Sequence, residues 1–340
     1  MKSVLKARLL LGAMLICVAI ALTARAWRNE NSDDNITITT RIPQQNNAGA
    51  TENNSLVGLN DVIFTPAGER QIRPQLTPLS TEYIARLSNF NYLTHNIFLT
   101  DPRTKLLPTD INIPEFLEKD LTIDTSVQGP QVLIFHAHSM EMFVDSNPND
   151  PMTGVFGVGR YLAEILANDH GIEVMHYMGR FDVVNGQPHR PGSYERLEPV
   201  IRQILEDNPS IQMVIDLHRD GVPEHLPPFV TYVDGQRTAQ IMFVNGLSRR
   251  YRNGEILPVP WLPNPYQQEN LALSLNLQLA ANQLYPNLTR RIYLLEFRYS
   301  LHMSPLSILL EVGAQNNTLQ EALNAMHPTA NVIAAVVLAD

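Results

Sequence analysis

Three side chains that commonly bind metal ions follow an apolar run near the middle of the chain. The segment "VLIFHAHSMEMF" covers residues 132–143, and its four apolar residues lead directly into His136, His138 and Glu141. Imidazole nitrogens and carboxylate oxygens are ligands of catalytic zinc sites, which take three of them and leave a fourth position for water. The segment therefore indicates a metal centre at the end of a buried strand.

Two further predicted strands end in the same way. The run "MVIDL" leads into His218, and the run "SILL" leads into Glu311. Ligands of open parallel sheets bind beyond the carboxyl ends of the strands. We therefore expect separate strands to bring His138, His218 and Glu311 to one edge of a sheet.

The residue types at this edge are those of a zinc hydrolase. We expect His138, Glu141 and His218 to bind Zn²⁺. His136 is the main rival for a ligand position, because residues two apart on an extended strand face the same way, and it is otherwise a candidate contact for the substrate. Zinc lowers the pKa of a bound water to roughly 7 and polarises the scissile carbonyl. Glu311 is expected to serve as the general base and acid that moves the proton to the leaving amine.

Several other polar residues are candidates for supporting roles. Arg219 has two interpretations, a pair with a peptide carboxylate of the substrate or a structural ion pair. Asp216 also has two, orienting a metal-bound histidine or meeting solvent at the strand end. Asn245 and Asn270 are expected near the same edge, with helix capping as the favoured role of Asn270.

The elements that must position these residues alternate between strands and helices from about residue 81. Helical patterns at residues 158–169 and 196–209 separate apolar strand-like runs, and Pro199 fits the second helix only near its first turn. Thr318 and Glu321 form a T-x-x-E capping box at the start of the last predicted helix. This alternation predicts an α/β fold with a mostly parallel sheet covered by helices on both faces.

The N-terminal segment, residues 1–27, has the pattern of an export signal or membrane anchor. Lys2, Lys6 and Arg8 precede an apolar run over residues 9–22, and an A-x-A pattern follows. The physical pattern alone leaves cleavage and anchoring equally open. The sequence therefore predicts a protein that works outside the cytoplasm.

The rest of the chain divides into a tether and one domain. Residues 28–79 are rich in Asn, Thr, Asp and Pro, and this composition predicts a flexible polar tether. Residues 80–340 are long enough for one domain with a sizeable core. The net charge of −9 argues against nucleic-acid binding. Cys17 is the single cysteine and lies in the apolar run, which excludes a disulfide, a thiol nucleophile and a cysteine metal site in the domain.

From about residue 90 to its C-terminus the chain resembles the stage II sporulation protein P family. The resemblance is carried, in the same order, by "VLIFHAHSMEMFVDS", "VIDLHRDGV", "IMFVNGLS" and the long segment from "NPYQQENLAL" to "SILLEVGAQNNTLQEALNAM". It implies an amidase 3-like zinc hydrolase fold. It also implies a zinc-dependent N-acetylmuramoyl-L-alanine amidase that degrades septal peptidoglycan during sporulation and engulfment, with members that also cut stem-peptide crosslinks as endopeptidases.

The family motifs fall on the same residues as the physical argument. The resemblance implies that the metal ligands and the catalytic glutamate are His138, Glu141, His218 and Glu311. The chain departs from the family pattern at Ala137, Met140 and Ser300. None of these departures removes a ligand, so they concern contacts with the substrate.

The resemblance also implies partners and a location. The expected substrates are the stem peptides and glycan of peptidoglycan, and the expected partners are stage II sporulation proteins D and M. An uncleaved N-terminal segment would hold the protein in the cell membrane, with the C-terminal domain facing the cell wall. The alternative is a catalytically idle scaffold that binds peptidoglycan at the septum. An idle member is expected to lack one of the four site residues, and this chain retains them all.

Overall fold

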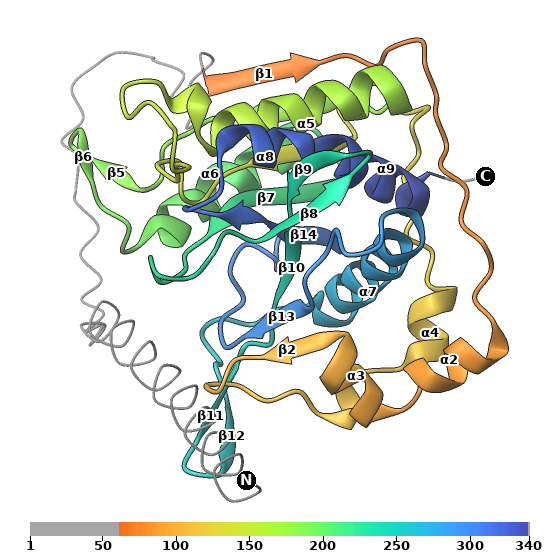
Figure 1. The fold of residues 1–340 in the computed structure, drawn as a ribbon. Helices are drawn as coiled ribbons and strands as arrows, with labels where there is room; N and C mark the ends of the chain where they lie inside the picture. Colours follow the sequence, from red (N-terminus) through yellow and green to blue (C-terminus); the bar gives the residue numbers. More distant parts are fainter. Residues whose placement is uncertain (1–60, 339–340) are drawn as a thin grey trace, which may run out of the picture. The chain divides into compact units, whose positions relative to one another are not determined.

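A sheet of eight strands runs through the part of the chain that the structure, a computed structural model, describes, which is residues 61–338 (Figure 1). The order of the strands is β1-β4-β3-β7-β14-β10-β13-β2. Their bounds are β1 Val62–Thr65, β2 Phe98–Thr100, β3 Val132–Phe135, β4 Val174–Tyr177, β7 Met213–Asp220, β10 Ile241–Gly246, β13 Ile292–Leu295 and β14 Leu306–Ala314. All neighbours are parallel except the pairs β1–β4 and β14–β10, so the sheet is mostly parallel, as predicted.

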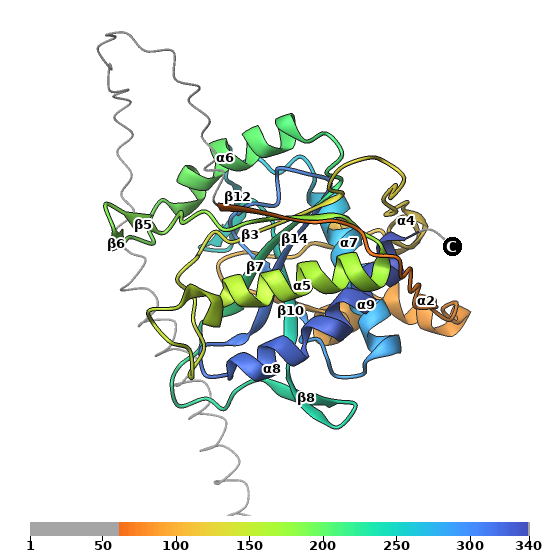
Figure 2. The same cartoon turned by 90° about the horizontal axis from the view of Figure 1, so that it is seen from above.

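Helices cover both faces of this sheet, and Figure 2 shows α6 on one side and α5, α8 and α9 on the other. The helices are α2 Thr81–Leu87, α3 Phe90–Asn96, α4 Ile113–Glu118, α5 Val155–His170, α6 Ser193–Asp207, α7 Gln267–Leu284, α8 Leu319–Asn324 and α9 Met326–Val337. Short 3-10 turns and two-stranded hairpins complete the described chain: η2 Pro108–Asp110, η3 Pro151–Thr153, β5 Val183–Val184 with β6 Gln187–Pro188, β8 Val230–Val233 with β9 Gln236–Ala239, and β11 Arg249–Arg252 with β12 Glu255–Pro258.

The core explains why the central strands are apolar throughout. All four residues of β3 are buried. Ile134 belongs to the cluster that includes α5, α7 and α9, whereas Leu133 and Phe135 pack with Leu197 of α6. A strand with packed helices on both sides needs an unbroken apolar run, which is what the sequence shows. The predicted α/β class is confirmed.

The direction of the strands reverses between β14 and β10. Strand β14 is parallel to β7, with Glu311 in register with His218, and antiparallel to β10, with Met242 opposite Glu311. The carboxyl ends of β3, β7 and β14 therefore share one edge. The expectation that Asn245 and Asn270 lie at this edge is wrong: Asn245 is at the far end of β10, and Asn270 donates to the Pro305 carbonyl before β14 begins, at 3.1 Å.

The folded part of the chain begins before residue 80. Strand β1 pairs with β4 at one edge of the sheet, although it falls in the predicted tether. Backbone hydrogen bonds from Gly68 to the Ala167 carbonyl (2.9 Å) and from Ile72 to the Asp169 carbonyl (2.7 Å) then bind the following segment to the end of α5. The predicted anchor and the tether up to residue 60 lie outside the described residues. None of the helices within residues 61–338 combines the length and apolar character needed to cross a bilayer.

The predicted helix boundaries hold in one case and fail in another. Thr318 caps α8 with its side chain, and Glu321 returns the contact to the Thr318 backbone, as the capping box predicts. Helix α6 begins at Ser193, so Pro199 lies in its second turn and not near the first. Because proline has no N–H, the hydrogen bond that would run to the Glu195 carbonyl is missing at this point of α6.

Candidate active site

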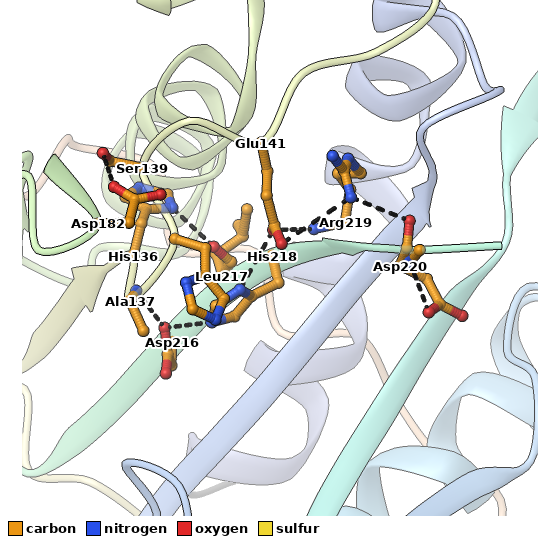
Figure 3. A network of polar contacts seen from close by, with 12 residues as sticks. His136, Ala137, Ser139, Glu141, Asp182, Asp216, Leu217, His218, Arg219 and Asp220 are labelled. Atoms are coloured by element: carbon orange, nitrogen blue, oxygen red, sulfur yellow. Dashed lines mark hydrogen bonds and ion pairs between the residues drawn. The ribbon is translucent and has the colours of Figure 1, made fainter. Parts of the chain in front are cut away.

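The carboxyl ends of β3, β7 and β14 bring the predicted site residues together. Glu311 and His218 are register partners on neighbouring parallel strands, so their side chains lie on the same face of the sheet. The ring of His138 lies 5.2 Å from the ring of His218, centroid to centroid. Glu141 contacts His218 directly, as Figure 3 shows. The four residues therefore form one cluster, although they come from three segments of the chain.

His218 is held between two carboxylates (Figure 3). Its Nδ1 lies 3.2 Å from Glu141 Oε2, and its Nε2 lies 2.7 Å from Asp216 Oδ1. Burial disfavours the charged imidazole, but the negative charges of Asp216 and Glu141 outweigh it and raise the pKa of His218 well above its ordinary value. Without a metal ion, His218 is therefore a cation in a buried ion-pair network.

Asp216 is fixed from several directions. Its Oδ1 also accepts a hydrogen bond from Ala137 N at 2.9 Å, and its Oδ2 accepts one from Ser300 Oγ at 2.7 Å. The residue is fully buried, which excludes a solvent contact at the strand end. Desolvation raises the pKa of this carboxyl, but the charge of His218 and the hydrogen bonds from His218, Ser300 and Ala137 together outweigh it, so the pKa is lowered. Asp216 therefore keeps its negative charge and orients the imidazole of His218.

Glu141 lies in the tight turn that follows β3. Its backbone carbonyl accepts from Val155 N at 3.1 Å, which ties the turn to the start of α5. Its Oε2 accepts from Arg219 N at 3.0 Å, and its Oε1 lies 3.2 Å from Nη2 of Arg190. Burial raises the pKa of Glu141, but the charges of His218 and Arg219 outweigh it and lower the pKa. The carboxylate is therefore ionised and aimed at His218.

Glu311 contributes a carboxyl group without a hydrogen-bonding partner at one oxygen. Its Oε2 is buried and accepts no hydrogen bond from any described residue. Desolvation, with the charges of Asp220 and Glu141, raises the pKa of Glu311 to about 8. A carboxyl group whose pKa lies near neutrality is suited to both accepting and donating a proton.

His136 does not join this cluster. It is fully buried, with Nδ1 2.7 Å from the Leu217 carbonyl oxygen and Nε2 2.8 Å from Nε2 of His176. Its ring packs against Phe156 of α5, with centroids 5.1 Å apart. Because β3 ends at Phe135, the chain from His136 to His138 is not a regular strand and the expected two-residue alternation does not apply. The structure thus places His136 behind the site, away from solvent and substrate.

Arg219 is largely occupied by the protein itself. Its Nε donates to the Met142 carbonyl at 3.0 Å, its backbone N–H donates to Glu141, and its side chain is 18% exposed. These contacts fix the Glu141 turn against β7. They favour the structural interpretation of Arg219 over a contact with substrate.

Part of the cluster has the spacing of zinc ligands, although no group of three His, Cys, Asp or Glu side chains in residues 61–338 is arranged to hold a metal ion. Two ligands of a tetrahedral zinc ion, with bonds of about 2.0–2.1 Å, lie roughly 3.3 Å apart. His218 Nδ1 and Glu141 Oε2 are 3.2 Å apart, which matches that separation. A carboxylate on the second nitrogen, as Asp216 provides, regularly accompanies metal-binding histidines. The neighbouring His138 is available as the third ligand.

The sequence interpretation missed the loop that faces this cluster, residues 178–192. Asp182 of this loop accepts from Ser139 Oγ at 2.5 Å and from Met140 N at 3.1 Å (Figure 3). Arg190, near the end of the loop, contacts Glu141. In the sequence, the serine of the H-x-H-S-x-E motif, Ser139, indicates a hydrogen bond to another segment. No sequence pattern around Arg190 predicts its contact with Glu141.

Comparisons with known proteins add the family. Stage II sporulation protein P of Bacillus subtilis (strain 168) is 25% identical over 145 residues, which cover 41% of this chain and only 32% of that protein. Two solved structures are more distantly similar, N-acetylmuramoyl-L-alanine amidase AmiC2 of Nostoc punctiforme (16% identity, 60% of this chain, 92% of that chain, TM-score 0.33) and N-acetylmuramoyl-L-alanine amidase from Clostridium difficile 630 (15%, 61%, 94%, 0.34). The family model for stage II sporulation protein P matches residues 26–334, so this chain belongs to that family.

Proposed function

We propose that this protein is a zinc-dependent N-acetylmuramoyl-L-alanine amidase that removes stem peptides from septal peptidoglycan during sporulation and engulfment. Membership of the stage II sporulation protein P family supports a peptidoglycan hydrolase that acts in sporulation. The observation that carries the proposal is the placement of His218 between Glu141 and Asp216, beside the unpartnered carboxyl oxygen of Glu311. A structural ion pair alone would not need a buried third carboxyl group, that of Glu311, in the same cluster.

Each residue of the cluster has a role in amide hydrolysis. His138, Glu141 and His218 would hold zinc, which polarises the amide carbonyl and makes a water molecule acidic enough to attack it. The carboxylate of Asp216 accepts a hydrogen bond from the Nε2–H group of His218. This contact leaves the lone pair on Nδ1 of His218 free to bind the metal ion. Glu311 takes a proton from the attacking water and passes it to the nitrogen of the leaving L-alanine, so that the amine departs neutral.

We further infer that the protein acts outside the cytoplasm, held to the membrane by residues 1–27. The basic residues and the apolar run of this segment support the inference. The same family membership makes stage II sporulation proteins D and M the partners to test first. Protease treatment of intact protoplasts is expected to remove the C-terminal domain and leave a short membrane-bound fragment. A domain that is protected until the membrane is opened would contradict this orientation.

The bond that is cut decides between the candidate activities. Purified protein with zinc is expected to release stem peptides with a free N-terminal L-alanine from cell-wall sacculi, and mass spectrometry of the products identifies them. Products cut within the crosslinks would add an endopeptidase activity. Binding to sacculi without any release would contradict the amidase and support the idle scaffold.

Replacing His218 tests the metal. We expect His218→Ala to lose bound zinc, and its turnover to fall below the detection limit. The substitution removes a proposed zinc ligand and leaves the carboxylate of Asp216 without the imidazole that it orients. Zinc content by atomic absorption and release of stem peptides are the two measurements. The exposed His225→Ala serves as control and should keep both. Full zinc content in His218→Ala would contradict the assignment.

Replacing Glu311 separates chemistry from metal binding. We expect Glu311→Gln to keep zinc while turnover falls about 10²–10⁴-fold, the usual contribution of a general acid or base. The exposed Glu255→Gln in β12 is the matched control and should keep full turnover. Loss of zinc in Glu311→Gln would assign Glu311 to the ligand set and leave the general base to another residue.

A further inference from the structure

The loop of residues 178–192, between β4 and α6, is attached to its surroundings by side-chain hydrogen bonds at both of its ends. At one end Asp182 is bonded to Ser139 and Met140, the residues between His138 and Glu141. The guanidinium of Arg196 in α6 joins the two ends, because it donates to the backbone carbonyls of Phe181 at 2.6 Å, His189 at 2.7 Å and Pro191 at 2.9 Å. A loop fixed at both ends holds its side chains at defined positions relative to the site.

Arg190 is the side chain that this loop directs at the site. Its Nη2 lies 3.2 Å from Glu141 Oε1, while its side chain is 63% exposed and that of Glu141 is only 4% exposed. Arg190 therefore connects the solvent-exposed surface to the buried carboxylate of Glu141. Among residues 61–338, Glu141 is the one carboxylate within ion-pair distance of Arg190.

Arg190 and Arg219 differ in how much of each guanidinium the protein itself uses. Arg219 is mostly buried, and its Nε is committed to the Met142 carbonyl. Arg190 makes a single ion pair and keeps most of its surface in water. A substrate can reach Arg190 without breaking any backbone contact, whereas Arg219 would first have to release the Glu141 turn.

The ion pair of Arg190 depends on the charge of Glu141. This inference rests on the proposed function, in which Glu141 binds a metal ion. The metal ion would then neutralise the carboxylate of Glu141, and the guanidinium of Arg190 would remain as a positive charge next to it. A guanidinium pairs with a carboxylate through two parallel hydrogen bonds. Because Arg190 contacts a ligand residue, an anion bound to it would lie within a few bonds of the scissile amide.

We propose that Arg190 binds a carboxylate of the stem peptide close to the amide bond that is cut, and so selects for substrates that carry a free acid there. In a stem peptide of the form L-Ala-D-Glu, the α-carboxylate of the second residue is the nearest such group. Peptidoglycan in which this group is an amide, D-isoglutamine, cannot form the ion pair. The loop thereby sets the preference of the site for acidic over amidated stem peptides.

The test compares two substrates that differ only at this carboxylate. Muropeptides with D-Glu and with D-isoglutamine at the second position are digested by the zinc-loaded full chain and by Arg190→Gln. We expect Arg190→Gln to lower kcat/KM about tenfold or more on the D-Glu substrate, mainly through KM, and no more than about twofold on the amidated one. Arg190→Lys should recover part of the loss. The control Arg70→Gln removes another exposed arginine, 68% exposed and paired with Asp169 at 2.8 Å, and should leave both rates unchanged.

A binding measurement separates this inference from the proposed function. Calorimetry with the free tripeptides L-Ala-γ-D-Glu-L-Lys and L-Ala-γ-D-isoglutaminyl-L-Lys, in both of which the γ-carboxyl is blocked by the bond to lysine, is carried out on the zinc-loaded Glu311→Gln chain, with and without Arg190→Gln. Tighter binding of the acid that disappears in Arg190→Gln supports the role of Arg190, even if the parent protein cleaves neither muropeptide and the amidase proposal fails. Equal losses on both substrates, or no loss on either, would overturn the role of Arg190 while leaving the amidase proposal intact.

Discussion

At the scale of single residues, the two carboxylates that contact His218, those of Glu141 and Asp216, differ in their surroundings. The carboxylate of Glu141 contacts the largely exposed side chain of Arg190. Asp216 is fully buried, and its two carboxylate oxygens accept hydrogen bonds from Ala137 and Ser300. Glu141 thus has one partner that is open to solvent, whereas every partner of Asp216 is buried. Asp216 is therefore suited to orient His218, and Glu141 to bind what enters the site.

The role of Asp216 predicts an effect on metal affinity without a change of ligand. We expect Asp216→Asn to weaken zinc binding about 10–100-fold, because the amide no longer provides the charge that fixes the His218 imidazole. Competition with a chromogenic chelator measures the affinity. The control Asp207→Asn, at the exposed end of α6, should leave it unchanged. An unchanged affinity in Asp216→Asn would show that His218 does not need this partner.

Behind the site, Gly159 of α5 makes room for the His136–His176 pair. A Cβ atom at this position would lie 2.8 Å from Cε1 of His136 and 3.1 Å from Nε2 of His176. His136 in turn contacts the carbonyl of Leu217, the residue before His218. The small size of Gly159 thus allows α5 to approach the strand ends closely.

This close approach predicts that an added methyl group is harmful. We expect Gly159→Ala to lower the free energy of unfolding by about 1–2 kcal/mol, since overpacking costs more than the better helix propensity of alanine recovers. The matched control is Gly221→Ala, where an added Cβ meets nothing within 4 Å. Urea denaturation of both variants tests the difference. Equal stability of Gly159→Ala and the parent would mean that α5 can shift without cost.

At the scale of the elements, β1 closes the edge of the sheet. It pairs with β4 over four residues, and the segment after it hydrogen-bonds to the end of α5. An unpaired β4 would present free backbone groups at the edge, which promotes association between chains. The boundary predicted at residue 80 would remove this strand.

Two shortened chains test the contribution of β1. A chain that begins at residue 61 is expected to unfold at the same temperature as one that keeps the preceding tether. A chain that begins at residue 80 is expected to unfold several degrees lower and to associate, since it exposes the edge of β4. Calorimetry and light scattering provide the two measurements. Identical melting temperatures for the two shortened chains would show that β1 adds nothing.

The sequence identified most elements correctly because their periodicity was strong. The runs that became β3, β7 and β14 ended in the residues that now meet at one edge, and the capping box marked the start of α8. Strand direction was not predictable in the same way, because an apolar run is the same for parallel and antiparallel neighbours. The reversal at β10 and the early strand β1 were missed for that reason and because β1 lies next to a polar segment.

At the scale of the whole molecule, buried histidines give the fold a dependence on pH. Burial, with the charge of the neighbouring His136, lowers the pKa of His176 well below its ordinary value of 6.5. A group with a lowered pKa in the fold is neutral there while the unfolded chain takes up a proton. Histidine burial therefore stabilises the fold above about pH 6.5 and loses this contribution as the pH falls below that value.

The direction of this effect can be measured on one variant. Each unit of pH below 6.5 costs up to about 1.4 kcal/mol as long as folded His176 stays neutral. We expect His176→Leu to lose less stability than the parent between pH 7 and pH 5 in the presence of a chelator. Met175→Leu, on the same strand, changes no imidazole and should follow the parent. Parallel curves for His176→Leu and the parent would place the acid sensitivity elsewhere.

The sequence predicts those residues of the site that follow directly after the carboxyl ends of neighbouring strands. His138, Glu141, His218 and Glu311 are brought together as expected, and their chemical roles remain predictions. The loop with Arg190 was not predictable, because its position depends on contacts with Asp182 and Arg196 that no sequence spacing encodes.

The change of direction at β14 also affects how such a protein can diversify. The loop that follows β10 leaves the sheet at the end opposite to the candidate site, and the hairpin β11–β12 lies in it, whereas the loop after β13 brings Ser300 to Asp216. Insertions in the loop after β10 would enlarge the molecule at a distance from the candidate site. Relatives can thus acquire additional segments at one end of the sheet while the candidate site at the other end keeps its geometry.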